Sequence, residues 1–271
     1  MKIRIIQKII DKIRGKKPSF VTGKNNKIFI QNQNEEYLLK NLGEVLHITG
    51  DNNVIKFVSE HLKTFPIGLK IDIYGSNNYI EIHEPNFWDS FIWVTNNNNK
   101  FIMHRPYQLV KGGGFHLGDG GIIEIEKDVE IGNSALWIVV NGDYNNTHKL
   151  FIGEGTHIAK DAIIRTSDGE CLLDYNSEKP ISEPQDVYIG KHCWITSRCT
   201  ILKGSHIPDN TIVGANSLVN KKFKDEYTLI AGVPAKVKKD KVKWKAGSYK
   251  INMLEYENNE TKRMFNIKEN L

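Results

Sequence analysis

Residues 187–219 have the sequence VYIGKHCWITSRCTILKGSHIPDNTIVGANSLV, in which an aliphatic residue returns at every sixth position. The aliphatic row consists of Ile189, Ile195, Ile201, Ile207, Val213 and Val219. A second row, two residues earlier, holds only small side chains: Cys193, Cys199, Ser205, Thr211 and Ser217. A period of six fits neither an α-helix nor a plain hairpin, but it fits a chain that runs straight, turns and repeats. Stacked aliphatic residues would fill such a coil, so the stretch predicts a parallel β-helix.

Further upstream, a second motif marks the expected corners of the coil. Gly or Asn precedes a short alternating strand at 23–28 (GKNNKI), 50–55 (GDNNVI), 75–80 (GSNNYI), 96–101 (NNNNKF) and 118–123 (GDGGII). Both residue types tolerate left-handed backbone angles, as a tight corner requires. We therefore expect an all-β protein with one continuous β-helix over residues 20–235.

The two ends of the chain differ from this pattern. Residues 1–19 begin with MKIRIIQKIIDKIRGKK and predict a short basic amphipathic helix. Such a helix either caps the open end of the coil or, through residues 1–17, touches an anionic membrane surface; both interpretations stay open. It lacks the features of a signal peptide or a membrane span, so we expect a cytoplasmic protein, with a peripheral position at the inner membrane as the alternative. Residues 236–271 form a polar C-terminal tail.

Composition excludes several classes of protein. The chain has 37 Lys and Arg against 32 Asp and Glu, and a net charge of +5 is too small and too scattered for a nucleic-acid groove. Three cysteines argue against a disulfide framework and fit a reducing compartment. Cys193 and Cys199 fall in the small-residue row and are expected to be inert packing residues. No cluster of His, Cys and acidic residues has metal-ligand spacing, so no metal is expected.

Three segments in a fixed order carry a resemblance to a known family. They are RTSDGECLLD at 165–174, the hexads that follow from residue 186, and LIAGVPAKVKK at 229–239. Over about residues 110–240 the chain resembles the hexapeptide-repeat acetyltransferases, in the branch that O-acetylates sugars of capsular polysaccharide and O-antigen. The resemblance implies a left-handed parallel β-helix with its catalytic coils at about 130–235. It also implies a homotrimer with acetyl-CoA between neighbouring subunits.

The resemblance places the catalytic base in the turn after IIRTSDG, where the family has a histidine. This sequence has Glu170 at that place. A carboxylate is ordinarily a weak base for an alcohol, although repulsion from Asp168 would strengthen it if both side chains point the same way. Either Glu170 acts as the base, or the site uses another residue or has lost the activity. His148 is the other candidate, because it ends the loop GDYNNTH about one coil earlier, at what should be the same corner.

The remaining site residues follow from the resemblance. Trp194 matches a tryptophan that lines the pocket for the thioester and the acceptor in the family. The alternative is that Trp194 packs at a subunit interface. The pantetheine groove would run past Thr196, Ser197, Gly214 and Ala215, although many relatives have glycine where this chain has Thr196. The adenine end of CoA would lie under Ala231, Gly232, Pro234 and Lys236, with solvated lysines as the alternative for the basic residues. His157 and His192 are expected to be ordinary turn residues.

Two functions remain in competition. The first is an acetyl-CoA-dependent O-acetyltransferase that acts on a sugar hydroxyl of a bacterial surface polysaccharide or its precursor. The second is a catalytically degenerate β-helix that binds a glycan or a protein partner as a scaffold. Trp88, Trp93 and Tyr107 could form a sugar-stacking platform, or could serve as core or trimer contacts.

Overall fold

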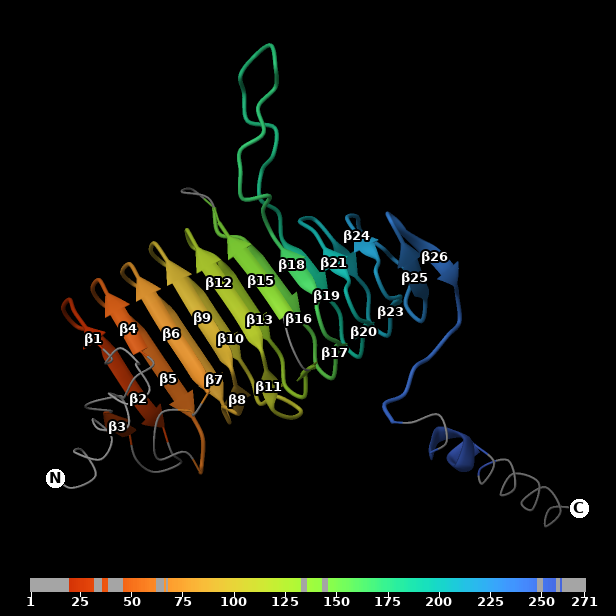
Figure 1. The fold of residues 1–271 in the computed structure, drawn as a ribbon, viewed down its shortest axis with the longest axis horizontal. Helices are drawn as coiled ribbons and strands as arrows, with labels where there is room; N and C mark the ends of the chain where they lie inside the picture. Colours follow the sequence, from red (N-terminus) through yellow and green to blue (C-terminus); the bar gives the residue numbers. More distant parts are fainter. Residues whose placement is uncertain are drawn as a thin grey trace, which may run out of the picture.

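The computed structural model describes residues 20–31, 36–38, 46–61, 66, 68–132, 136–142, 146–247, 251–256 and 259. Its strands stack into one elongated β-helix with the chain running from one end to the other (Figure 1). The only helix among the described residues is short, at residues 251–256. The expected all-β parallel β-helix is confirmed. The predicted amphipathic helix at 1–19 lies outside the described residues.

Two long sheets run the length of the coil. Sheet A contains β1 (Phe20–Val21), β4 (Leu46–Thr49), β6 (Leu69–Tyr74), β9 (Ser90–Thr95), β12 (Gly113–Gly118), β15 (Leu136–Asn141), β18 (Ile163–Arg165), β21 (Thr200–Ile201) and β24 (Leu218–Val219). Sheet B contains β22 (His206–Ile207), β19 (Val187–Ile189), β16 (Lys149–Ile152), β13 (Ile122–Ile125), β10 (Lys100–Met103), β7 (Tyr79–His83), β5 (Val54–Val58), β2 (Lys27–Gln31) and β3 (Glu36–Leu38). Apart from β3, which runs antiparallel to β2, neighbouring strands in both sheets are parallel.

Shorter sheets close the third side of the coil. Sheet C pairs β8 (Phe87–Trp88) with β11 (Val110–Lys111). Sheet D contains β14 (Glu130–Ile131), β17 (His157–Ile158), β20 (Trp194–Ile195), β23 (Ile212–Val213), β25 (Leu229–Gly232) and β26 (Ala235–Lys239). The last two strands form an antiparallel hairpin, so strand structure continues to Lys239. The C-terminal coils therefore have three flat sides, which follow one another along the chain in the order A, B, D.

The six-residue rhythm produces the interior of these C-terminal coils. All six members of the aliphatic row are completely buried, and the small-residue row is at most 2% exposed. Cys193 and Cys199 are among these buried residues, which confirms their packing role. Burial raises the pKa of the Cys193 thiol to about 12 and also raises the pKa of Cys199.

Asparagine residues build the corners of the N-terminal coils. Asn25, Asn52 and Asn77 have left-handed φ angles of 60°, 57° and 59°. In each case the next residue is also Asn, and these residues form a ladder in which the amide of Asn53 donates to Asn26 and that of Asn78 donates to Asn53. Asn99 extends the ladder by one more step. Leaving one of these buried amides without its partner would cost about 1–3 kcal/mol, so the ladder confirms the predicted corners.

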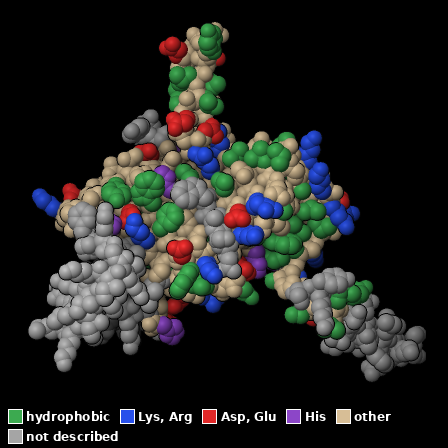
Figure 2. All heavy atoms as spheres, viewed as in Figure 1, with side chains coloured by type: hydrophobic (Ala, Val, Ile, Leu, Met, Phe, Trp, Pro, Cys, Tyr) green, Lys and Arg blue, Asp and Glu red, His purple; other side chains and the backbone are tan. Residues whose placement is uncertain are grey.

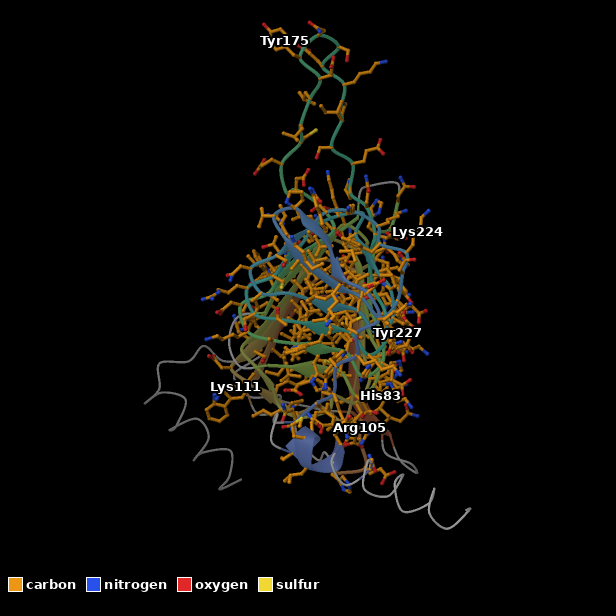
Figure 3. All side chains as sticks on the ribbon, turned by 90° about the vertical axis from the view of Figure 1, so that its right-hand side faces the viewer. His83, Arg105, Lys111, Tyr175, Lys224 and Tyr227 are labelled. Atoms are coloured by element: carbon orange, nitrogen blue, oxygen red, sulfur yellow. The ribbon has the colours of Figure 1, made fainter. Side chains whose placement is uncertain are left out.

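One long connection interrupts the coil. Between β18 and β19 the chain leaves the body as a projecting hairpin over residues 167–186, whose end carries Tyr175 (Figure 3). A hydrogen bond from the Gln185 N–H to the Thr166 carbonyl closes its base at 2.8 Å. Leu172, Leu173 and Ile181 are exposed on it along with Tyr175. Among the described residues no helix is both long and apolar enough to cross a membrane.

Candidate active site

Two connections stack at the corner between sheets A and B. The chain passes from β15 to β16 through residues 142–148, and one coil later from β18 to β19 through residues 166–186. Because β15 pairs with β18 and β16 pairs with β19, the described ends of these two connections lie one above the other. His148 and the turn that contains Asp168 and Glu170 therefore occupy the same corner, as expected from the length of a coil.

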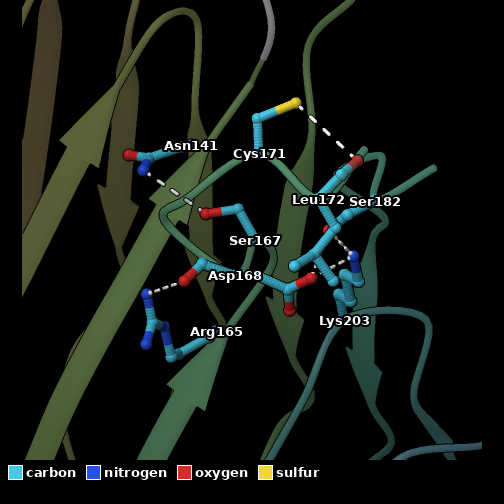
Figure 4. Close-up of polar contacts among 8 residues, drawn as sticks. All are labelled: Asn141, Arg165, Ser167, Asp168, Cys171, Leu172, Ser182 and Lys203. Atoms are coloured by element: carbon cyan, nitrogen blue, oxygen red, sulfur yellow. Dashed lines mark hydrogen bonds and ion pairs between the residues drawn. The ribbon is translucent and has the colours of Figure 1, made fainter. Parts of the chain in front are cut away.

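The turn after β18 is held by backbone and side-chain contacts (Figure 4). Arg165 Nη2 donates to the carbonyl of Asp168 at 2.9 Å, and Gly169 has a left-handed φ of +91°. A Cβ atom at Gly169 would come within 2.9 Å of that same Arg165 nitrogen. The backbone angle favours glycine here, and any larger residue would also have to displace the flexible end of Arg165.

Asp168 is fixed as a structural anion. Lys203 Nζ donates to its carboxylate at 2.6 Å, and the hydroxyl of Ser182 donates to the same oxygen. These hydrogen bonds, that from Lys203 first and that from Ser182 second, hold the pKa of Asp168 below its usual value. Since the lysine offsets its charge, Asp168 does not supply the uncompensated repulsion on Glu170 that the sequence suggested. Its contacts instead join the hairpin to the next coil.

Glu170 lies beyond Gly169 on the outgoing side of the hairpin. Its side chain is exposed and makes no polar contact with the residues that the structure describes. The surroundings therefore provide no group that orients this carboxylate toward a substrate.

His148 has an oriented imidazole. Its Nδ1 lies 3.3 Å from Asp186 Oδ1, and the side chain is only 17% exposed. The backbone N–H of Lys149 donates to the same Asp186 oxygen at 2.9 Å, which fixes the carboxylate. A carboxylate that accepts a hydrogen bond from Nδ1–H selects the tautomer in which Nε2 is unprotonated and can accept a proton. His148 is thus paired with a carboxylate, as a general base requires. Glu170 was expected beside it, but the carboxylate it contacts is that of Asp186.

Asn141 is a residue of this corner that the sequence reasoning missed. Its amide Nδ2 donates to Ser167 Oγ at 3.4 Å, while its buried Oδ1 has no partner among the described residues. The hydroxyl of Thr166 bridges to the Asn141 backbone on the neighbouring strand. The available signal was its position at the end of WIVVN, one coil before the turn. Asp186 and Lys203 were missed because nothing in the sequence reveals which way the long hairpin folds back.

The predicted cofactor residues gather at another corner, between sheets D and A. Thr196 and Gly214 follow β20 and β23, and their N–H groups bond to Val213 and Ile230 in the coils that follow. Thr196, Gly214 and Ala231 therefore form one column, in which a Cβ atom at Gly214 would come within 2.8 Å of the Ala231 Cβ. Ser197, Ala215 and Gly232 take the next positions beside the column. This stripe of small residues fits a long, narrow ligand.

The end of the column is basic. Pro234 and Lys236 lie in the exposed hairpin of β25 and β26, and Lys238 and Lys239 are exposed on the same strand. Ammonium groups of this kind suit phosphates as point charges. The residues present could therefore hold CoA, with the column of small residues beside its pantetheine arm and the lysines near its phosphates.

Trp194 lies on the outer face of sheet D, on the side of the cofactor column. Its ring centroid is 6.0 Å from that of Trp244, a residue of the C-terminal tail. Trp244 stacks on His192 at 4.4 Å, donates to the His192 carbonyl at 2.7 Å, and meets His157 at 4.8 Å. His157 and His192 are therefore more than ordinary turn residues, because together they dock the tail. Within one chain Trp194 and Glu170 lie on different faces of the coil.

No group of three or more potential metal ligands occurs in the part of the chain that the structure describes. The candidate site therefore consists of two separate parts. One is the A/B corner with His148, Asp186 and the turn at 166–170, and the other is the D/A column with Trp194 beside it.

Comparison with known proteins places this geometry in context. No protein-family model matches the chain. A polysialic acid O-acetyltransferase of Escherichia coli O1:K1 / APEC is 31% identical over 93 residues, which is 34% of this chain and 30% of that protein. WbbJ of Escherichia coli K12, named as a lipopolysaccharide biosynthesis O-acetyl transferase, is 44% identical over 122 residues, 43% of this chain and 60% of that protein. The matched stretch is thus less than two thirds of either relative.

Solved structures extend the likeness to most of the chain. The polysialic-acid-specific acetyltransferase NeuO superposes with a TM-score of 0.61 at 22% identity, over 85% of this chain and 89% of that one. The polysialic acid O-acetyltransferase OatWY gives a TM-score of 0.52 at 24% identity, over 85% and 92%. The resemblance to the hexapeptide-repeat acetyltransferases is confirmed. The likeness of fold thus covers 85% of the chain, a larger share than the 34% and 43% that the two sequence matches cover.

Proposed function

We propose that the protein transfers an acetyl group from acetyl-CoA to a sugar hydroxyl of a bacterial surface polysaccharide or its precursor. The observation that carries this proposal is the His148–Asp186 pair, at 3.3 Å, beside the turn where the family places its base. The names of the two sequence relatives support the class of acceptor and the reaction. A cytoplasmic reaction agrees with the three unpaired cysteines.

In this proposal His148 replaces the family histidine from a different position. His148 Nε2 accepts the proton of the sugar hydroxyl as its oxygen attacks the thioester carbonyl, and Asp186 stabilises the resulting imidazolium. The imidazolium then returns the proton to the leaving CoA thiolate. The CoA thioester supplies the activated acyl group, and the lysines of β26 hold its phosphates. Glu170 has no part in the proton transfer.

We further propose a homotrimer in which the two parts of the site meet between subunits. One chain keeps the A/B corner and the D/A column apart, so a base from one subunit and a CoA groove from the next would complete each other. The exposed Leu172, Leu173, Tyr175 and Ile181 support this arrangement, because a projecting apolar hairpin marks a protein contact.

The test measures CoA release from acetyl-CoA in the presence of capsular and O-antigen polysaccharides. His148→Ala should lower the rate by about 10²–10⁴-fold, the usual contribution of a general base, whereas Glu170→Gln should retain most of it. Equal activity of His148→Ala and the parent would overturn the assignment of the base.

Calorimetry with CoA and acetyl-CoA tests the alternative of a glycan-binding scaffold without chemistry. The exposed Glu170 at the family's histidine position is the observation that favours this alternative. Absence of CoA binding at millimolar concentration would support the scaffold and contradict the transferase.

A further inference from the structure

The outer face of sheet A carries a hollow that is separate from the A/B corner site and lies three strands away from it. It has a volume of about 580 Å³ and lies over β6 and β9. Figure 2 shows hydrophobic side chains gathered on this face of the coil, with a histidine beside them. The residues that matter for its chemistry are Tyr74, Phe91 and Trp93, together with Lys70, Asp72 and Asp89.

The aromatic part of the hollow is exposed yet held in place. Trp93 is 40% exposed and Tyr74 is 46% exposed, although both stand on regular strands of the sheet. The Trp93 indole stacks on His116 of the next strand, with centroids 4.6 Å apart and ring planes 24° apart. His116 is tied in turn to the Thr95 hydroxyl at 3.1 Å. The indole therefore offers a flat apolar surface whose orientation is already fixed before a ligand arrives.

The polar part is equally organised. Asp72 lies opposite Trp93 on the neighbouring strand. Its carboxylate lies 2.9 Å from His47 Nδ1 and forms an ion pair with the Lys70 ammonium. Asp89 adds a second carboxylate at the rim. Fixed carboxylates beside a flat ring suit a pyranose, whose hydroxyl groups donate hydrogen bonds while its C–H face lies on the ring. Against the one ammonium of Lys70, Asp72 and Asp89 leave the hollow with an excess of one carboxylate, which disfavours an anionic sugar polymer relative to a neutral one.

The position of the hollow connects it with the proposed reaction. In the strand register Asp72, Trp93, His116, Val139 and Arg165 form one row across sheet A. Arg165 lies at the root of the turn that holds Asp168. Three strand spacings separate Trp93 from Arg165, a distance of roughly 14 Å. Val139 in this row is buried, so a polysaccharide that starts at the hollow would have to pass over it to reach the A/B corner with another of its sugar units.

We propose that this hollow is a saccharide subsite that holds a neutral segment of the acceptor polymer while a more distant unit reacts. The proposal rests on the proposed function for the identity of the acceptor, but the binding itself needs no chemistry. Trp88 and Tyr107, which the sequence grouped with Trp93, do not line the hollow, since Trp88 lies on sheet C and Tyr107 packs near His157.

The test uses an array of purified bacterial capsular and O-antigen polysaccharides, with neutral members and polysialic acid, probed with the labelled full chain. The parent protein should bind neutral members in preference to polysialic acid, and Trp93→Ala should weaken that binding at least tenfold. Trp88→Ala is the matched control, because it removes a nearby tryptophan that is even more exposed, at 56% against 40%, and that does not line the hollow; it should bind as the parent does. Binding that survives Trp93→Ala, or is confined to polysialic acid, would overturn the subsite.

Two further measurements distinguish the saccharide subsite from a contact between copies of the chain and from the proposed transferase activity. Sedimentation of Trp93→Ala should give the parent's oligomeric state, whereas dissociation would show that the face is a contact between copies and overturn the proposal. Acetyl transfer to a short oligosaccharide should be unchanged in Trp93→Ala, while transfer to the polymer falls. Polymer binding that depends on Trp93 in a chain without transferase activity would support the subsite and contradict the proposed function.

Discussion

At the scale of single residues, our proposal has a histidine from the preceding coil, His148, take the role that the resemblance assigned to the position of Glu170. Glu170 is exposed, Asp168 is committed to Lys203, and His148 is the group with an orienting carboxylate. The role of a base thus depends on what surrounds a side chain more than on its place in a motif. Asn141 belongs to the same corner through its Nδ2, which donates to Ser167, whereas its buried Oδ1 lies toward Gly118 and has no partner among the described residues.

The three cysteines give a prediction at the same scale. Burial raises the pKa of Cys193 to about 12 and raises that of Cys199, so both thiols should stay protonated and unreactive near pH 8. Cys171 is exposed. We expect a thiol reagent to modify one cysteine per native chain, and Cys171→Ser to abolish that reaction. Rapid modification of two or three thiols in the folded protein would contradict the packing described for the small-residue row.

At the scale of elements, the hexads and the Gly-Asn-Asn corners made the coil predictable, because both leave a fixed spacing in the sequence. The same spacing predicts which connections lie at the same corner of the coil, and it correctly put His148 at the corner that holds the turn at 166–170. The contacts of the hairpin at 167–186 were not predictable from spacing. Ser182 and Asp186 stand on this long irregular connection, and Lys203 of the next coil contacts it, so no fixed interval in the sequence relates them to their partners. The contact of Trp244 with His192 and His157 was also missed, because the tail after β26 follows no repeat that would fix its position.

The docked tail should respond to pH. Burial lowers the pKa of His157, with His192 acting in the same direction and Glu130, 3.1 Å away, opposing it. A lowered pKa means that the folded state prefers the neutral imidazole. The stability this contributes is present above the unfolded value of about 6.5 and is lost as the pH falls below it. We expect Trp244 fluorescence to report release of residues 240–247 between about pH 7 and 5.

A matched variant checks the cause of that release. His157→Gln cannot gain a charge, so its tail should stay docked over the same pH range. Trp244→Phe should remove the fluorescence change without altering the coil. An identical pH response in the His157→Gln protein would assign the release to another group.

At the scale of the whole molecule, the coil separates the proposed base from the proposed CoA groove. The order of sheets A, B and D sends the 166–186 connection out at one corner and stacks Thr196, Gly214 and Ala231 at another. A single chain therefore offers two halves of a site, and only an assembly of copies would unite them. This consequence follows from the topology and does not depend on which sugar is the acceptor.

Mixing two inactive variants tests this account most directly. His148→Ala removes the proposed base, and Ala215→Trp places a bulky side chain at an exposed turn position beside the proposed cofactor column, away from the buried small-residue row. Each variant alone should be inactive. Co-refolded in equal amounts, they should regain about a quarter of the parent rate, because random assembly gives that share of interfaces two intact halves. No recovery in mixed assemblies of the correct size would contradict a site shared between subunits.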